Sequence, residues 1–244
     1  VKYSLHPLGV EDVIEQCPTK IDKYGNHYFV AVEHLSLASP LDGSVPVRVR
    51  GLHVVLICSG PPLWDTVVTV EQPDRSFEAE WKAWALDSSD DCCTCMPWFE
   101  RLKLRLSASR SRLRERRADF LVHQILDLFT DELLAIGRAY SCRLVYLDSQ
   151  LQDKNLETLM DWFSEVSEIR MQLGVVARRV RSMQRVLRNI VLDPDLGQGI
   201  AGYLQDVKDH LDEAYEDTTC LVERIRAATE GYERQLEREQ DRAQ

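Results

Sequence analysis

The sequence lacks the short motifs that mark the common enzyme classes. It contains no G-x-S-x-G nucleophile turn, no H-E-x-x-H zinc motif, no Walker loop and no glycine fingerprint for dinucleotides. Such motifs hold a nucleophile, a metal or a phosphate in a fixed geometry, and no other pattern in the sequence does so. The sequence therefore predicts a protein that is not an enzyme.

Long hydrophobic runs are also absent. The best apolar run, Val54 to Cys58, stops at Ser59-Gly60-Pro61-Pro62 and falls far short of the roughly 18 apolar residues that a spanning helix needs. The chain opens at Val1 without an initiator Met or a signal-peptide pattern. We therefore expect this stretch to be water-soluble and to begin inside a longer protein.

The sequence has fewer basic residues than acidic ones. Asp and Glu number 40 against 30 Lys and Arg, which gives a formal net charge of -10 and a pI near 5.1. This balance argues against nucleic acid as the partner and makes metal cations the natural counterpart. The seven cysteines are an odd number spread over a long chain, so we expect reduced thiols in a reducing compartment.

The apolar pattern changes near residue 100. Short β-branched runs broken by Gly and Pro come before it, and apolar residues at helical spacing come after it. The predicted fold class is α+β, an α/β sandwich domain followed by long antiparallel helices and a stalk helix. The expected boundaries are residues 1–100, 101–192 and 193–244.

Individual elements follow from the same patterns. Pro7 suits the first turn of a short helix that runs to Gln16, and Gly51 is expected to divide or bend a long strand. The other elements expected in this part are strands at His27–Leu35, Val45–Cys58 and Thr66–Glu71, a helix at about Phe77–Leu86 and a loop at Asp87–Pro97. Three helices are expected after it, at about 112–150, 153–190 and 199–244, the last two separated by Asp193-Pro194-Asp195 and nearby glycines.

The last helix carries a heptad seam. Apolar residues from Ile200 to Tyr232 are spaced 4-3-4-3 without interruption, and the helix would be on the order of 65 Å long. Its charged end suggests that it continues towards something absent from this sequence. A row of carboxylates faces away from the seam and consists of Asp206, Asp209, Glu213 and Glu216. Such a row could collect hard cations, although a solvated helix face is the simpler interpretation.

Two other clusters have plainer explanations. Cys92, Cys93 and Cys95 include a C-x-x-C pair, but a structural zinc site needs four ligands, so we expect free thiols. The run from Arg101 to Arg117 holds eight basic residues and one acid without interleaved aromatics. It is expected to be a solvated helix entry, or a contact for the acidic last helix, and not a nucleic-acid site.

Four stretches together, in this order, resemble the CorA family of magnesium and cobalt channels. They are His6–Ile14, Tyr24–Val30, Arg117–Asp127 and Tyr203–His210. The resemblance implies the cytosolic part of a homopentameric channel, whose stalk helix continues into membrane helices absent from this sequence. It also implies regulatory Mg²⁺, with Co²⁺ or Zn²⁺ as alternatives, between neighbouring subunits at Asp12 and Asp206. Positions matching Glu11 and Asp127 are implied as a second, weaker ion site.

Some family features lie outside the sequence or depart from the family pattern. The Gly-Met-Asn signature and both membrane helices would follow Gln244, the first strands would precede Val1, and the loop around Cys92–Cys95 does not follow the bacterial pattern. Two alternatives stay open. One is a zinc transporter of the ZntB type, and the other is a soluble coiled-coil scaffold, which the heptads would also permit. The downstream sequence would separate the channel from the scaffold.

Overall fold

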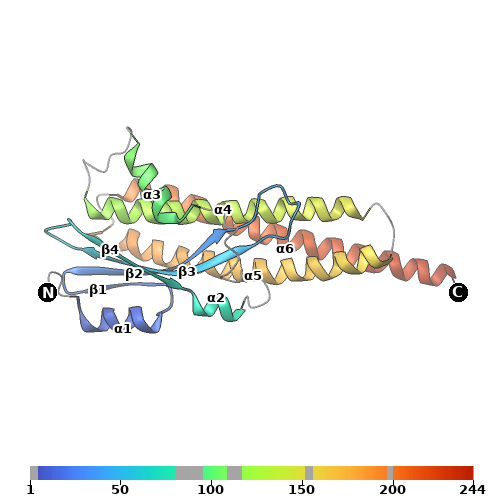
Figure 1. The fold of residues 1–244 in the computed structure, drawn as a ribbon, viewed down its shortest axis with the longest axis horizontal. Helices are drawn as coiled ribbons and strands as arrows, with labels where there is room; N and C mark the ends of the chain where they lie inside the picture. The colour runs from blue at the N-terminus through green and yellow to red at the C-terminus, as the bar shows by residue number, and fades with distance from the viewer. Residues whose placement is uncertain (1–4, 81–95, 109–116, 152–155, 197–199, 244) are drawn as a thin grey trace.

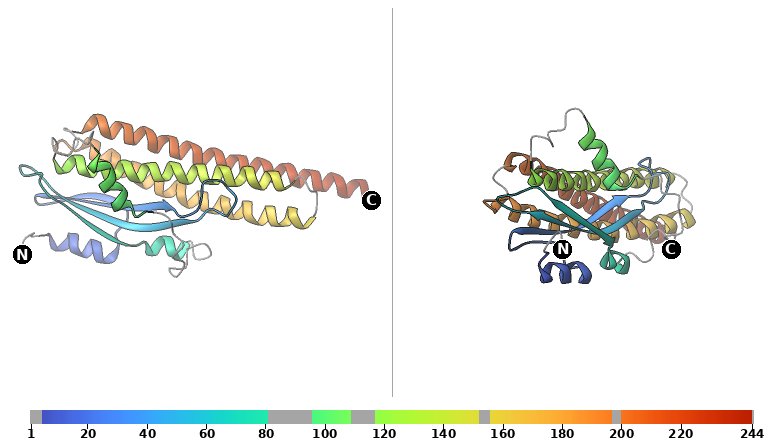
Figure 2. Two further views of the ribbon diagram at one scale, coloured as in Figure 1. Left: turned by 45° about the horizontal axis from the view of Figure 1, so that its top comes forward. Right: turned by 60° about the vertical axis from the view of Figure 1, so that its left-hand side comes forward.

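The chain forms a four-stranded sheet sandwiched between short and long helices (Figures 1 and 2). The computed structural model describes residues 5–80, 96–108, 117–151, 156–196 and 200–243. Helices α1 (Pro7–Glu15) and α2 (Arg75–Glu80) lie on one side of the sheet. Helices α3 (Trp98–Ser107), α4 (Ala118–Gln150), α5 (Leu156–Leu192) and α6 (Ala201–Ala243) lie on the other. The predicted α+β class with long helices is confirmed.

The sheet is antiparallel throughout and follows the chain order. Its strands are β1 (Lys20–Tyr24), β2 (His27–Leu37), β3 (Val49–Ser59) and β4 (Val67–Pro73). Alternate residues of a strand point to opposite faces. Tyr28 and Val30 therefore join the large core against the long helices, whereas Phe29 and Ala31 join a smaller core under α1.

Gly51 was expected either to divide or to bend its strand, and the structure shows that it does not divide it. β3 runs through it without a break and pairs Gly51 with Leu35. A Cβ on Gly51 would lie 2.4 Å from the buried ring of Phe77 at the start of α2. The glycine is needed because α2 packs directly onto the strand at this point.

Two elements were not expected. β1 has no buried residue, and its mixture of charged and apolar residues gives little strand signal. α3 falls within the basic run and buries only Trp98 and Leu102. The predicted loop up to Cys95, with its three cysteines, lies outside the described residues, as does most of the helix expected at Phe77–Leu86. Among the described residues, Cys17, Cys58, Cys142 and Cys220 are free thiols.

The heptad seam of α6 is buried within the chain. Its residues from Ile200 to Ile225 are almost fully covered, and they belong to one core with α4, α5 and the sheet. α6 lies along both α4 and α5. The four carboxylates predicted to face away from the seam are all exposed. The seam is therefore occupied by the chain's own helices and is not free to form a coiled coil with another chain.

Two buried arginines fasten the helices to the sheet and to each other. Arg179 of α5 pairs with Glu33 of β2 and, at 3.3 Å, with Asp74 ahead of α2. Arg143 of α4 binds both carboxylate oxygens of Glu165 in α5, at 2.6 and 2.8 Å. Two-pronged contacts of this kind fix orientation as well as distance. They make the sheet and the long helices one packed unit; the expected division into three parts stays a prediction.

Candidate functional site

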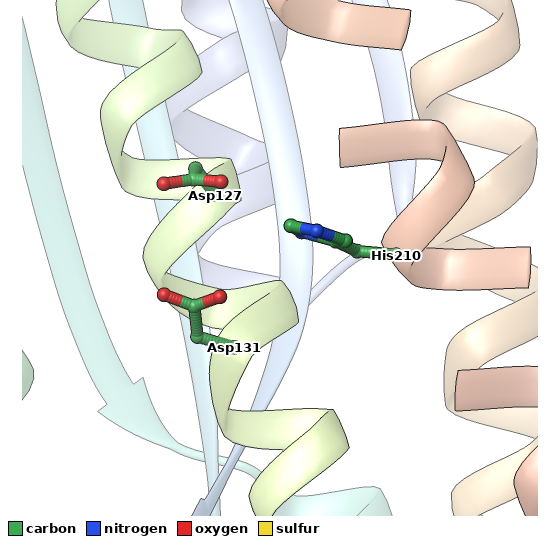
Figure 3. A group of neighbouring side chains, drawn as sticks. All are labelled: Asp127, Asp131 and His210. Carbon is green, nitrogen blue, oxygen red and sulfur yellow. The ribbon is translucent and has the colours of Figure 1, made fainter. Parts of the chain in front are cut away.

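A group of side chains that could bind a metal ion lies where α4 and α6 face each other (Figure 3). Asp127 and Asp131 lie one helical turn apart on α4, and His210 points towards them from α6. One ligand atom from each of the three lies within 4.8 Å of the others. The Nδ1 atom of His210 is buried and has no hydrogen-bond partner among the described residues. This is the only such group in the described part of the chain.

Helix α3 supplies a positive charge to the same carboxylates. The guanidinium of Arg105 contacts Asp127 at 2.8 Å and also contacts Asp131. α3 is held in place by the buried side chain of Trp98, whose indole N–H donates to Glu71 at 2.8 Å. One turn before Arg105, Arg101 pairs with Glu132, which is almost fully buried. The arginines of the basic run that the structure describes, Arg101, Arg105 and Arg117, therefore pair with acids of α4.

The donor set defines which ions could bind there. Two carboxylates and an imidazole suit Zn²⁺ and Co²⁺, which accept nitrogen ligands readily. Mg²⁺ prefers oxygen ligands and would use the carboxylates while keeping several waters. A divalent ion would have to share the two carboxylates with the guanidinium of Arg105 or displace it.

Asp206 lies one turn before His210 on α6 and is exposed. It is close enough to the buried His123 of α4 to act on that side chain electrostatically, as is Asp127. Burial lowers the pKa of His123, and the two carboxylates oppose this effect without cancelling it. The structure thus places two of the predicted metal ligands, Asp127 and Asp206, within electrostatic reach of the same histidine, although Asp206 itself is exposed.

Asp12 is engaged in contacts of its own. Its carboxylate accepts hydrogen bonds from the ammonium group of Lys20 at 2.8 Å and from the hydroxyl of Tyr24 at 2.6 Å. Burial raises the pKa of Asp12, but the two hydrogen bonds outweigh burial, so the net pKa is lowered. The same hydrogen bond from Tyr24 raises the pKa of the tyrosine to about 12.

Within one chain, the four predicted ligands do not form a single site. Asp12 and the exposed Glu11 lie on α1, whereas Asp127 and Asp206 lie on helices beyond the other face of the sheet (Figure 2). An ion shared by Asp12 and Asp206 would need two copies of the chain. Whether these residues bind metal stays a prediction.

Sequence reasoning missed the partners of Asp127. Asp131 could have been found from its spacing, because residues four apart share a helix face. His210 occupies the side of the heptad that faces α4, seven residues after Tyr203, which packs against Phe120. Nothing local in the sequence indicated that Arg105 would reach them, since α3 has to fold back across α4.

Comparisons with known proteins bear on the family and on the fold. The family described as CorA-like Mg²⁺ transporter protein matches residues 94–243, more than half of the chain. No curated protein matches the sequence. In the described part of the chain, no helix combines the length and apolar character needed to cross a membrane.

Three solved structures share the fold. The ZntB cytoplasmic domain from Vibrio parahaemolyticus is 8% identical with a TM-score of 0.60, and the match covers 96% of this chain and 80% of that one. The full-length CmaX protein is 12% identical with a TM-score of 0.62, and the match covers 98% and 64%. The complete CorA magnesium transporter from Methanocaldococcus jannaschii is 12% identical with a TM-score of 0.65, and the match covers 93% and 61%. This chain thus spans less than two thirds of the last two.

Proposed function

This chain belongs to the CorA-like Mg²⁺ transporter family, and on that premise we propose that it is the cytosolic ion-sensing part of a homopentameric divalent-cation channel. In this proposal α6 is the stalk that links the sensor to the membrane helices of the whole protein. The chain's task is to report the cation concentration to the pore, and it has no catalytic role.

The observation that carries the proposal is the group at Asp127, Asp131 and His210, because it joins the stalk to α4. Two carboxylates one turn apart repel each other, and a divalent cation between them turns this repulsion into attraction. If the same ion also bound His210, it would tie α6 to α4 at this level. Ion occupancy would then favour one position of the stalk, as differential binding to one of two states requires.

The second part of the proposal concerns neighbouring copies. Asp12 of one copy and Asp206 of the next are assigned, on the family resemblance, to an ion that bridges subunits. α1 and α6 lie on opposite sides of the sheet, which agrees with a site that only assembly completes. Loss of the ion would weaken the contact and free the stalk to move.

Isothermal titration of this chain with Mg²⁺, Co²⁺ and Zn²⁺ tests the proposed sensor directly. We expect saturable binding, weakened by Asp127→Asn and by Asp131→Asn. Glu100→Gln is the matched control, because it removes an exposed carboxylate that pairs only with Lys103 among the described residues. If none of the three ions bound, or if the control weakened binding as much as the other two variants, the sensor assignment would be lost.

A zinc transporter of the ZntB type is the second candidate. The imidazole of His210 favours it, because nitrogen donors select Zn²⁺ over Mg²⁺. His210→Ala should then weaken Zn²⁺ binding far more than Mg²⁺ binding. A soluble coiled-coil scaffold is less well supported, since the seam that would serve it is buried in the chain's own core.

A further inference from the structure

The C-terminal half of α5 gathers positive charge around a hollow. Between Glu168 and Asp193 the chain carries six arginines and no acidic residue, in a protein that has an excess of acids. Side chains of this stretch surround an open hollow of about 440 Å³, which is large enough to hold a small molecule. The residues that line it are Arg178, Arg181, Ser182, Gln184, Arg185 and Arg188.

Three of the lining arginines are exposed and carry charge that the described residues do not neutralise. Arg181, Arg185 and Arg188 form no ion pair with any residue that the structure describes, whereas Arg178 has an interaction of its own. Like charges three or four residues apart on a helix repel each other and destabilise it. The dipole of α5 favours cations only in the last turn, and α5 ends at Leu192, so the dipole accounts for Arg188 alone. A bound anion would relieve the remaining repulsion.

The acid of α6 that lies level with the hollow is already satisfied by other groups. Asp212 accepts a hydrogen bond from the side chain of Gln184 at 2.7 Å. Its other carboxylate oxygen lies 3.0 Å from the ammonium group of Lys208, one turn earlier on α6. Lys208 therefore balances the charge of Asp212, and this pair adds no net negative charge to offset the arginines.

The guanidinium groups are held in place but keep unused donors. Arg181 lies over the ring of Tyr215, 4.9 Å from its centre, and its Nε donates to the tyrosine hydroxyl at 3.0 Å. Arg185 donates to the hydroxyl of Ser182 at 3.0 Å, and Arg188 donates to no residue that the structure describes. Because each guanidinium has five N–H groups, most of these donors remain available to a ligand.

We propose that this hollow binds a linear polyphosphate, either free or as the phosphate chain of a nucleotide. The planar fork of a guanidinium matches the oxygens of a phosphate group and can bind two of them at once. Arg181 and Arg188 lie about 10 Å apart along the helix, from about 1.5 Å per residue. A single phosphate can reach two neighbouring arginines, whereas a chain of linked phosphates can contact all three.

A short polyphosphate suits this hollow better than an acidic peptide does. Its phosphates carry several negative charges within a few bonds of each other. The carboxylates of a peptide carry one charge each, on flexible side chains that lose conformational entropy when they bind. The inference goes beyond the proposed ion sensor and does not depend on it, because Asp127, Asp131 and His210 do not line the hollow.

Isothermal titration of the chain with sodium tripolyphosphate, in buffer free of divalent ions, tests this assignment. We expect saturable binding at one site per chain. Arg185→Gln with Arg188→Gln should weaken it by at least about tenfold, because hydrogen bonds from two charged groups are lost. Arg185→Lys with Arg188→Lys keeps the charge but not the fork, and should restore only part of the affinity. Inorganic phosphate should bind at least about tenfold more weakly than tripolyphosphate, because it contacts fewer arginines.

Titration with ATP separates the two sources of the phosphate chain. If ATP binds more tightly than tripolyphosphate, the nucleoside adds contacts and the site is assigned to nucleotides. If ATP binds equally or more weakly, the phosphate chain alone is recognised and the site is assigned to free polyphosphate.

Arg226→Gln with Arg234→Gln is the matched control, since it removes the same charge from exposed positions farther along α6 that pair with Glu230. It should leave the affinity within about twofold of the wild type, because salt screens distant charges. Thermal unfolding of each variant shows whether the fold is kept. The inference would be overturned if the wild type did not bind tripolyphosphate saturably, or if the control lost as much affinity as the glutamine variant of the hollow. A hexaglutamate peptide that bound as tightly as tripolyphosphate would also overturn it, because the surface would then be a contact for an acidic protein.

Discussion

The ammonium group of Lys20 lies 2.8 Å from the carboxylate of Asp12 and equally close to that of Asp22. The residue proposed to meet an ion at the subunit interface therefore already has a fixed cation beside it. An incoming divalent ion would have to compete with Lys20, which is less favourable than binding to an unpaired carboxylate. Lys20 would then set the ion concentration at which that site fills.

We predict that Asp12→Asn and Asp206→Asn raise the Mg²⁺ concentration needed for closure in the full-length protein, whereas Lys20→Met lowers it. Removing a carboxylate weakens the ion's hold, and removing the competing ammonium group strengthens it. Limited proteolysis of the stalk across a Mg²⁺ titration, together with ion flux, measures both shifts. Equal Mg²⁺ midpoints for the wild type and all three variants would show that α1 takes no part in sensing.

Arg105 should oppose divalent binding at Asp127, Asp131 and His210. Arg105→Gln removes a charge that contacts both carboxylates, so we expect binding to tighten by about 1–2 kcal/mol, the interaction of a unit and a double charge at roughly 5 Å in water. Calorimetric titration with Co²⁺ or Zn²⁺ measures the change. Lys103→Gln on the same helix is the control and should have little effect. Unchanged or weaker binding by Arg105→Gln would mean that the guanidinium and the ion do not share these ligands.

Stability should fall as the pH drops below about 6.5, in part because of His34. This side chain is almost fully buried, stacks on Phe129 and has no hydrogen-bond partner at either ring nitrogen among the described residues. Burial, helped by the charge of Arg101, lowers its pKa to about 3. Between about pH 6.5 and 3 the unfolded chain binds a proton that the folded chain does not. At pH 5 this costs about 2 kcal/mol.

Urea denaturation of His34→Leu between pH 7.5 and 4.5 tests that assignment. The variant should lose about 2 kcal/mol less stability than the wild type on going to pH 5, while the exposed His6→Asn should behave like the wild type. Some slope should remain, because burial lowers the pKa of His123 in the same direction. Parallel pH profiles for His34→Leu and the wild type would contradict the prediction.

Gly51→Ala should destabilise the fold by about 1–3 kcal/mol, the usual range for overpacking a core. The added methyl group would meet the ring of Phe77, which is almost fully buried. Thermal or urea unfolding measures the loss. Adding Phe77→Leu should make the glycine substitution cost less than it does in the wild-type background. An equal cost in both backgrounds would show that the ring is not what makes glycine necessary.

The elements found from sequence are those whose own residues repeat a pattern. The α6 seam from Ile200 to Tyr232 repeats over about nine turns, so its buried face could be assigned before any partner was known. β1 and α3 were missed because their stability comes from neighbours. β1 is held by pairing with β2, and α3 by Trp98 and by arginines that reach α4.

The residues of the candidate site likewise fall into two classes, those that sequence could indicate and those that it could not. Asp12, Glu11, Asp127 and Asp206 were named through family resemblance, and their places on α1, α4 and α6 follow from helices that sequence could locate. The grouping of Asp127 with His210 and Arg105 depends on three helices that are far apart in the chain and packed side by side. No local pattern records that packing, so neither the imidazole donor nor the competing guanidinium could be foreseen.

The length of α6 gives it a mechanical consequence. It runs for 43 residues as one helix, about 65 Å at about 1.5 Å per residue, and His210 lies near its first end. A rigid rod pivoting near that end is a lever: a tilt of about 5° would displace its far end by about 5–6 Å over this length. Because α6 is packed against α4 and α5 as far as Ile225, such a tilt would carry those helices with it, and a small movement at His210 would arrive at the other end of α6 amplified to the width of a side chain.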